Sequence, residues 1–272
     1  MIAISETSNS RLRTVRLKAL AGLFLTSSAN ANLSVWVRNC FVTGYSPISV
    51  LSMAYALGIA PFALADPTQT VYPPKQPGPV VMVISGASSS LYGLYHDFTK
   101  AFADKGYYAV LLYGNEILRR EGGREALEGA IGRARQAAGA LPGKAGVIGF
   151  SLGGGAAIAF ATGMPEAVSV VIAWYPTTTF VADPAQFAAR VQVPTLVLQG
   201  ERDRYNNCCI VERVRAIEAA ARSRGAPFEL VVYPGAEHGF NLRSSSAYVR
   251  RDADDSWRRA LEMLDKHHPV TR

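Results

Sequence analysis

This sequence predicts an α/β fold, in which a mostly parallel sheet is covered by helices on both faces. Two observations support the prediction. From residue 80 to the C-terminus, short apolar runs alternate with amphipathic, helix-like segments, as in parallel strands joined by crossover helices. In addition, the pattern G-x-S-x-G at 149–153 follows an apolar run and precedes a small-residue helix. The chain has 272 residues and no internal repeats, so we expect it to form a single domain with one sizeable core.

The expected elements follow in chain order. Residues 66–79 hold five prolines and predict an extended lead-in to the domain. The domain itself is expected to cover 80–272, beginning with the continuous apolar run Val80–Ile84, which is typical of a buried strand. Further strands are predicted at 107–113, Ala145–Phe150, Val168–Trp174, 194–200 and Phe228–Tyr233, and helices at 91–105, 124–140, 207–224 and 248–267.

Residues 1–65 are expected to be a leader that is removed on export. The stretch 47–64 is apolar and uncharged, and Ala63-Leu64-Ala65 ahead of Asp66 fits a signal-peptidase cleavage pattern. The exported protein would be periplasmic or secreted. The alternatives are an uncleaved membrane anchor, because the apolar run approaches the ~20 residues that a span needs, and a disordered or wrongly assigned N-terminus.

A second export-like segment lies upstream of the first. Basic residues at 11–18 precede an apolar run and a cleavage-like Ala29-Asn30-Ala31. Because export signals usually run to ~15–30 residues, two stacked segments are unusual. We therefore expect translation to begin downstream, for example at Val35 or Val37.

The charge distribution argues against a nucleic-acid partner. The net charge is +7 and the pI about 9.4, but residues 1–65 hold five basic residues and one acid, which is +4 of that total. No basic run or basic–aromatic alternation remains beyond the leader. We expect no nucleic-acid binding and, once the leader is cleaved, no stable membrane association. The oligomeric state is left open.

Ser151, at the centre of Gly149-Phe150-Ser151-Leu152-Gly153, is the candidate nucleophile. A strand, this motif and a helix in immediate succession describe a sharp turn that lifts a serine hydroxyl above the carboxyl edge of a sheet. Glycines flank the serine because side chains there would crowd the turn. The alternative is an ordinary strand-to-helix turn with a solvated serine.

Asp203 and His238 are the candidate partners of this serine. Each follows an apolar strand, at the sheet edge where open α/β sheets place their sites, and the order Ser, Asp, His is that of the α/β-hydrolase fold. The imidazole would act as base and the carboxylate would hold its tautomer. Glu201 is the nearest rival carboxylate. The other histidines are expected at the surface: His96, His267 and His268.

The loop after the first buried strand, 85–90, is the candidate for half of an oxyanion hole. In this fold one backbone N–H comes from that loop and another from the residue after the nucleophile, which nominates Ala87 and Leu152. The alternative is an ordinary Ser/Gly loop. An acyl pocket is predicted along the same edge, although plain packing is the more usual role of aromatic residues there; its residues would be Ser88, Tyr92, Trp174 and Tyr175.

Three cysteines carry no catalytic or metal-binding pattern. Cys40 would leave with the leader, and Cys208 and Cys209 are adjacent. No metal site is expected, because a zinc site needs ligands at recognisable spacings. A disulfide between neighbours is strained and rare, so we expect two small buried thiols at the start of a helix.

Three motifs together resemble the dienelactone hydrolase family of α/β-hydrolases. They are G-F-S-L-G-G at 149–154, G-E-R-D at 200–203 and Y-P-G-A-E-H-G-F at 233–240, and the resemblance runs from about Pro79 to the C-terminal helix. The enzymes that name the family carry a cysteine nucleophile, whereas this chain has Ser151. The resemblance therefore implies general esterase chemistry rather than dienelactone hydrolysis itself.

The expected function is hydrolysis of a small-molecule ester or lactone through an acyl-enzyme, without a cofactor. A prolyl-oligopeptidase-like peptidase is an alternative, although that group usually carries a large extra domain. Thioesterase or polyester-degrading activity is also open. A binding protein on a retained hydrolase fold would be expected to have lost a triad residue, and none is lost here.

Overall fold

The continuous apolar runs of the sequence form the strands of one sheet in the computed structural model, which describes residues 66–118 and 121–270. The predicted leader lies outside these described residues. The sheet has seven strands in the order β1-β3-β2-β4-β5-β6-β7. Their bounds are β1 (Gln69–Tyr72), β2 (Val80–Ile84), β3 (Tyr108–Leu112), β4 (Ala145–Phe150), β5 (Val168–Trp174), β6 (Thr195–Gly200) and β7 (Phe228–Tyr233).

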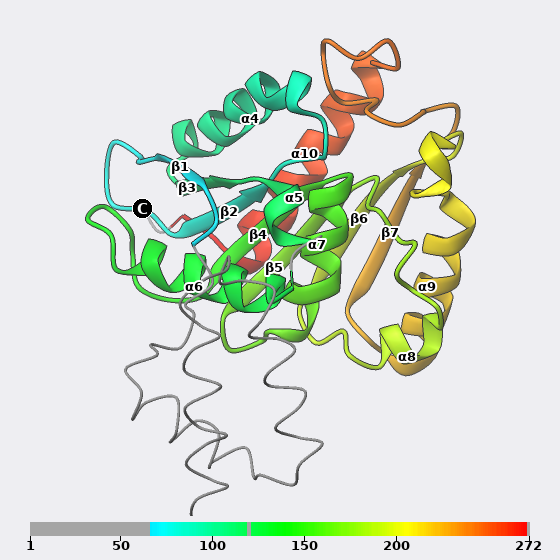
Figure 1. The fold of residues 1–272 in the computed structure, drawn as a ribbon, viewed down its shortest axis with the longest axis horizontal. Coiled ribbons are helices and arrows are strands. Elements are labelled where there is room, and N and C mark those ends of the chain that lie inside the picture. The colour runs from blue at the N-terminus through cyan, green and yellow to red at the C-terminus, as the bar shows by residue number, and fades with distance from the viewer. Residues whose placement is uncertain (1–65, 119–120, 271–272) are drawn as a thin grey trace, which may run out of the picture. The chain divides into compact units, whose positions relative to one another are not determined.

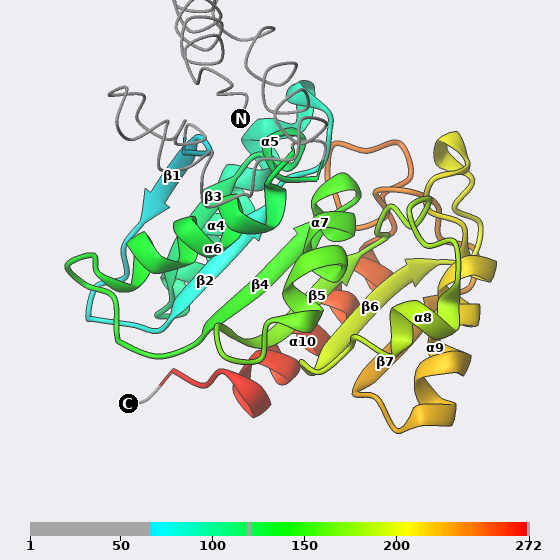
Figure 2. The same ribbon diagram turned by 60° about the horizontal axis from the view of Figure 1, so that its bottom comes forward.

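Helices cover both faces of this sheet (Figures 1 and 2). Their bounds are α4 (Tyr92–Asp104), α5 (Gly114–Ile117), α6 (Gly123–Arg135), α7 (Leu152–Phe160), α8 (Pro184–Ala188), α9 (Val211–Arg224) and α10 (Arg250–His267). One core lies between the sheet and α4 with α10, and a second lies under α5, α6, α7, α8 and α9. The predicted α/β class is confirmed. Among the helices of the described residues, none is long and apolar enough to cross a membrane.

The strand order brings the four candidate segments, which follow β2, β4, β6 and β7, to one edge of the sheet. Strands β2 to β7 are parallel, so all their carboxyl ends meet there. The chain winds outward from β2 in one direction and from β4 in the other, and the neighbouring ends of β2 and β4 form the switch point where such sheets bind ligands. The loop after β2 therefore lies beside Ser151.

The lead-in differs from its prediction. It is extended, as expected, but Gln69–Tyr72 pairs antiparallel with β3 and forms the edge strand of the sheet. This strand is free of proline, whereas Pro67 and Pro73 stand on either side of it. Because proline cannot donate to a strand ladder, the two prolines limit the pairing to the segment between them, of which Gln69–Tyr72 pairs.

Two predicted helices are shorter in the structure. The segment predicted at 124–140 ends at Arg135, and Gly139 beyond it adopts a φ of 90°, which is not helical. The segment predicted at 207–224 begins at Val211, because Asn206 and Asn207 lie in the left-handed region with φ of 47° and 51°. Asparagine tolerates this region better than most residues, and two such residues in succession interrupt a right-handed helix.

His268 was predicted to lie at the surface, and this prediction is wrong. It is only 6% exposed, and its ring stacks on Tyr107 at a centroid distance of 5.9 Å. Its ring nitrogens lie 2.9 Å from the Ser169 hydroxyl and 2.9 Å from the Val80 carbonyl. Burial lowers the pKa of this imidazole, so the ring is neutral near pH 7. This histidine ties the end of the chain to the sheet, far along the sequence from the triad.

Candidate active site

Ser151 occupies a strained turn between β4 and α7. Its φ of 53° and ψ of −114° lie outside the regions that side-chain-bearing residues favour. The backbone holds it there from both sides: its N–H donates to the Trp174 carbonyl, and its carbonyl accepts from the N–H groups of Gly155 and Thr177. The predicted elbow context is therefore present, and the hydroxyl stands at the amino end of α7.

Glycines around the serine allow α7 to cross the sheet closely. A Cβ on Gly149 would lie 2.2 Å from the carbonyl oxygen of Gly153, and a Cβ on Gly153 would lie 2.2 Å from the carbonyl oxygen of Ile84. Both contacts are with backbone, which cannot rotate away as a side chain can. The turn and the neighbouring strand end thus both require glycine at these positions.

Replacement of Gly153 by alanine should destabilise the protein by about 1–3 kcal/mol, because the end of β2 has to shift to admit the methyl group. The control is Gly132→Ala in α6, where a Cβ would meet nothing within 4 Å. That change should keep or raise the melting temperature, since alanine favours a helix over glycine by up to about 1 kcal/mol. Calorimetry of both variants checks this. Equal melting temperatures of the two variants would show that α7 and the end of β2 can accommodate a methyl group at position 153.

Ser151, His238 and Asp203 form one hydrogen-bonded chain. The Ser151 Oγ lies 2.9 Å from His238 Nε2, and His238 Nδ1 lies 2.8 Å from Asp203 Oδ2. A carboxylate can only accept, so Nδ1 donates to it, and the neutral ring then presents an unprotonated Nε2 to the serine hydroxyl. The structure brings together the three residues that the sequence nominated, in the arrangement that a serine nucleophile and its base require.

Asp203 is held by more than the histidine. Its side chain is fully buried, and its two oxygens also accept from the Gln199 amide at 3.3 Å and from the Tyr205 N–H at 3.1 Å. The rival Glu201 points elsewhere: its side chain is 43% exposed and pairs with Arg215 at 2.8 Å. Only Asp203 is thus placed to orient the imidazole.

Two tyrosine rings pack against the His238 ring. Tyr205, which is 53% exposed, stacks on it with centroids 4.4 Å apart and planes 11° apart. Tyr175 packs on it at 4.6 Å, is buried, and donates its hydroxyl to Asn241 Oδ1 at 2.8 Å. Tyr205 and Gln199 were not predicted from the sequence; the available signals were a polar glutamine inside an apolar strand and an aromatic residue two positions after Asp203.

The loop after β2 lies against the nucleophile. A Cβ on Gly86 would stand 3.5 Å from the Ser151 Cβ and 2.4 Å from the Tyr95 hydroxyl. Burial raises the pKa of Tyr95 to about 12, although a hydrogen bond with the backbone of Gly86 opposes the shift, so its phenol stays protonated near pH 7. Ala87 is exposed, and Leu152 opens α7. The role of the Ala87 and Leu152 N–H groups as donors to an oxyanion stays a prediction.

The structure buries two of the four residues predicted to line an acyl pocket, and the other two stay a prediction. Trp174 is fully buried, stacks on Phe150 and donates its indole N–H to Ser256, so it belongs to the core under α10. Tyr175 is also buried, behind the histidine, whereas Ser88 and Tyr92 are partly exposed. A cavity of about 470 Å³ between α4 and α10 is lined by none of the four. Strand-end position alone does not distinguish an inward-facing aromatic from one that faces a ligand.

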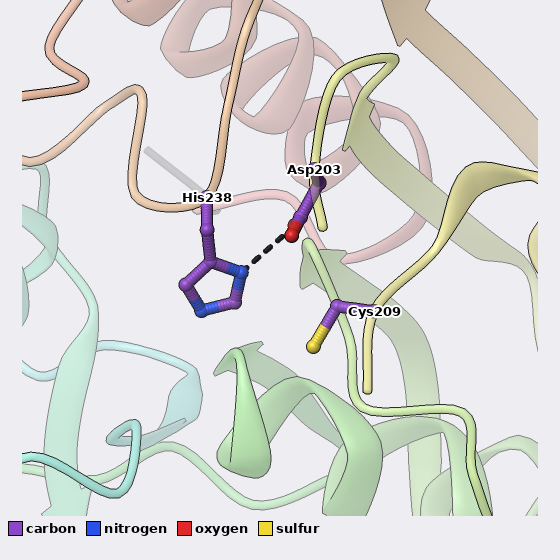
Figure 3. A group of neighbouring side chains, drawn as sticks. All are labelled: Asp203, Cys209 and His238. Atoms are coloured by element: carbon purple, nitrogen blue, oxygen red, sulfur yellow. Dashed lines mark hydrogen bonds and ion pairs between the residues drawn. The ribbon is translucent and has the colours of Figure 1, made fainter. Parts of the chain in front are cut away.

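The cysteine prediction is also wrong. Cys208 and Cys209 are joined by a disulfide, and both precede α9 rather than lying on it. Cys209 is fully buried, and its Sγ, the Asp203 carboxylate and the His238 ring nitrogen lie within 4.8 Å of one another (Figure 3). Asn206 and Asn207, both in the left-handed region, lie directly before the two cysteines, and the sequence spacing does not reveal that the sulfur comes this close to the triad.

The fold and the Ser–Asp–His order define an α/β-hydrolase. More specifically, the chain belongs to the dienelactone hydrolase family, whose sequence model matches residues 67–268. This confirms the resemblance carried by the three motifs.

Two individual proteins that resemble this chain share less than a third of its residues over the aligned region. "Putative carboxymethylenebutenolidase" of Escherichia coli (strain K12) is 30% identical over 127 residues, which cover 44% of this chain and 45% of the relative. The match thus spans a little under half of that protein's length. The solved "Putative Dienelactone Hydrolase from Klebsiella pneumoniae subsp. pneumoniae" is 22% identical with a TM-score of 0.61, covering 71% of this chain and 89% of its own.

A second solved structure shares the fold. "Thermogutta terrifontis esterase 2 phosphorylated by paraoxon" is 15% identical with a TM-score of 0.60, and the alignment covers 75% of this chain and 90% of that one. At this identity the similarity concerns the arrangement of the chain. Both solved structures reproduce the α/β-hydrolase architecture found here.

Proposed function

We propose that this protein is a serine hydrolase that cleaves carboxylic esters or lactones through an acyl-enzyme on Ser151. The observation that carries the proposal is the hydrogen-bonded chain from Ser151 through His238 to the buried Asp203, with the serine in its strained turn. Membership of the dienelactone hydrolase family supports the choice of ester and lactone bonds.

The first half of the reaction acylates the serine. Ser151 Oγ attacks the substrate carbonyl as its proton passes to His238 Nε2, which lies 2.9 Å away. Asp203 stabilises the imidazolium that forms. The N–H groups of Leu152 and Ala87 receive the oxyanion, since a preorganised donor pair favours the charge that appears in the transition state. His238 then gives its proton to the leaving alkoxide.

The second half releases the acid. Water enters, His238 Nε2 takes its proton, and the hydroxide attacks the acyl carbon; collapse of the second tetrahedral intermediate returns the proton to Ser151. Tyr205 and Tyr175 limit the movement of the ring during both transfers, because both pack against it. A serine hydroxyl at its ordinary pKa is a weak nucleophile, so this base is essential.

A structural neighbour's chemistry supports a serine acyl-enzyme. Thermogutta terrifontis esterase 2, which shares this fold, is phosphorylated by paraoxon, an event that a nucleophilic enzyme residue explains. In this family the presence of Ser151 in place of a cysteine favours general esterase chemistry.

The substrate class is tested with a panel of purified substrates. Short p-nitrophenyl esters, lactones, thioesters and peptide amides are assayed with the domain 66–272 and with the full chain. The proposal expects kcat/KM for esters or lactones to exceed that for amides by orders of magnitude. Preferential cleavage of peptide amides would instead favour the peptidase alternative, and hydrolysis of none would favour the binding-protein alternative.

We also propose that the protein is exported and cleaved after Ala65. The Ala63-Leu64-Ala65 pattern motivates this, and it lies outside the described residues. Asp66 is exposed and pairs with Arg133 at 2.7 Å, so a chain beginning there would keep its first contact with the domain. N-terminal sequencing after expression in a bacterial host should find Asp66 first. Protein that retains residues 40–60 in the cytoplasm would contradict export.

A further inference from the structure

The side of the catalytic histidine that faces Asp203 also faces a sulfur atom. Figure 3 shows Asp203, Cys209 and His238 converging from two loops, the one between β6 and α9 and the one after β7, and one ligand atom of each lies within 4.8 Å of the other two. Asp203 and Cys209 are fully buried, while the His238 side chain is 17% exposed. Thiolate, imidazole and carboxylate are the three side-chain ligands that zinc takes in proteins.

The spacing of these atoms is close to that of a tetrahedral zinc site. Zinc lies ~2.3 Å from a thiolate and ~2.0–2.2 Å from imidazole or carboxylate, which puts neighbouring ligand atoms roughly 3.5 Å apart. His238 Nδ1 and Asp203 Oδ2 are already 2.8 Å apart, and the Cys209 Sγ lies within 4.8 Å of a ring nitrogen of His238 and of a carboxylate oxygen of Asp203. Side-chain shifts on the order of 1 Å therefore suffice to form the site.

Neighbouring groups already orient two of the three ligands. The Gln199 amide donates to the Asp203 carboxylate at 3.3 Å and to the Cys209 carbonyl at 2.7 Å, and the Thr177 hydroxyl contacts the Cys209 Sγ at 3.7 Å. Outer partners of this kind fix ligand direction in metal sites. In the structure the sulfur is bonded to Cys208, and a disulfide sulfur is not the thiolate that zinc requires.

We propose that reduction of the Cys208–Cys209 disulfide converts this cluster into a three-residue zinc site that blocks the catalytic triad. A phosphine reductant supplies the two electrons: it becomes the phosphine oxide with an oxygen atom from water, and the two hydrogens of that water end on the two thiols. Zinc then displaces the thiol proton of Cys209, which leaves to solvent, and binds Asp203 and His238 Nδ1. The proton of Nδ1 moves to Nε2.

Blockage follows from the tautomer. With zinc on Nδ1, the neutral ring carries its proton on Nε2, so this nitrogen can donate to Ser151 but cannot accept its proton. The base is lost while the fold is kept. A three-residue zinc site keeps its fourth position for water, and of the three ligand side chains here that of His238 is partly exposed, at 17%. This consequence rests on the proposed hydrolase function; zinc binding itself does not.

Zinc binding is measured first, on the full chain. Wild type, Cys208→Ser and Cys209→Ser are prepared oxidised and after phosphine reduction, freed of reductant without air, and dialysed to equilibrium against zinc chloride. We expect about one zinc per chain in reduced wild type, and in Cys208→Ser with or without reduction, because its Cys209 is always free. Cys209→Ser should bind at least about 100-fold more weakly, since even an outer partner is worth 10- to 100-fold.

Ester hydrolysis is then measured in the same samples, as the ratio of rates with and without zinc within each variant. We expect a loss of tenfold or more, reversed by a chelator, in reduced wild type and in Cys208→Ser only.

Equal zinc binding in Cys209→Ser, or none in reduced wild type, would overturn the site. Zinc bound without inhibition would overturn coordination by Nδ1. Cys209→Ala, with circular dichroism, replaces Cys209→Ser if the serine variant does not fold, and dialysis decides the site even if no ester is cleaved.

Discussion

Ser151→Ala and His238→Ala are each expected to lower kcat for ester hydrolysis by roughly 10⁴- to 10⁶-fold, and the double variant should be hardly worse than either. The reason is geometric. The Ser151 hydroxyl lies 2.9 Å from the only base in the hydrogen-bonded chain, so the serine without the imidazole is not activated and the imidazole without the serine has nothing to activate. The two losses therefore overlap instead of adding.

Steady-state kinetics on a p-nitrophenyl ester checks this, with an organophosphonate as an independent probe. The reagent should add to Ser151 in wild type, as located by peptide mass mapping, and should not label Ser151→Ala. Ser223→Ala in α9 is the control, because its exposed hydroxyl contacts only the Ala220 carbonyl and its loss should leave kcat unchanged. Full activity in Ser151→Ala, or label at another residue only, would end the proposal of a serine nucleophile.

The sheet and the triad could be predicted because both depend on local sequence. Continuous apolar runs report burial on both faces, and parallel strands end at one edge, so residues that follow Phe150, Gly200 and Tyr233 had to be neighbours. The bounds of β5 and β7 agree with those predicted. The order of the three polar residues then selected the fold and its chemistry.

The parts that escaped prediction depend on contacts between distant segments or on backbone detail. Nothing within Gln69–Tyr72 states that it pairs with β3, and the burial of His268 is set by Tyr107 and Val80 across the chain. Trp174 ends a strand, as a pocket residue would, but alternation of side chains along β5 turns it to the α10 face.

The surroundings of His238 show the same limit at shorter range. Two asparagines in the left-handed region lie between Tyr205, which stacks on His238, and Cys209, whose Sγ approaches it. Side-chain identity permits that conformation without requiring it. It is therefore easier to predict the candidate catalytic residues from the sequence than to predict the side chains that surround them.

The role of Asp203 can be separated from that of Glu201 by two isosteric changes. Asp203→Asn should lower kcat by about 10⁴-fold, because an amide NH₂ facing Nδ1 favours the tautomer with the proton on Nε2, which cannot accept from Ser151. The structure supports this expectation, because Asp203 is fully buried and already accepts from the Gln199 amide and the Tyr205 N–H. An asparagine amide at this position therefore cannot rotate its NH₂ group into water.

Glu201→Gln is the matched control, two residues away and of the same chemistry. Its side chain is 43% exposed and paired only with Arg215 at the surface, where an ion pair contributes about 0–1 kcal/mol to stability. We expect kcat within a few-fold of wild type and a nearly unchanged melting temperature. Kinetics of both variants over pH 6 to 9, with circular dichroism to establish folding, decides between them. If Glu201→Gln were the crippled variant and Asp203→Asn the active one, the carboxylate that orients His238 in solution would be Glu201, and the loop between β6 and α9 would have to rearrange to bring it there.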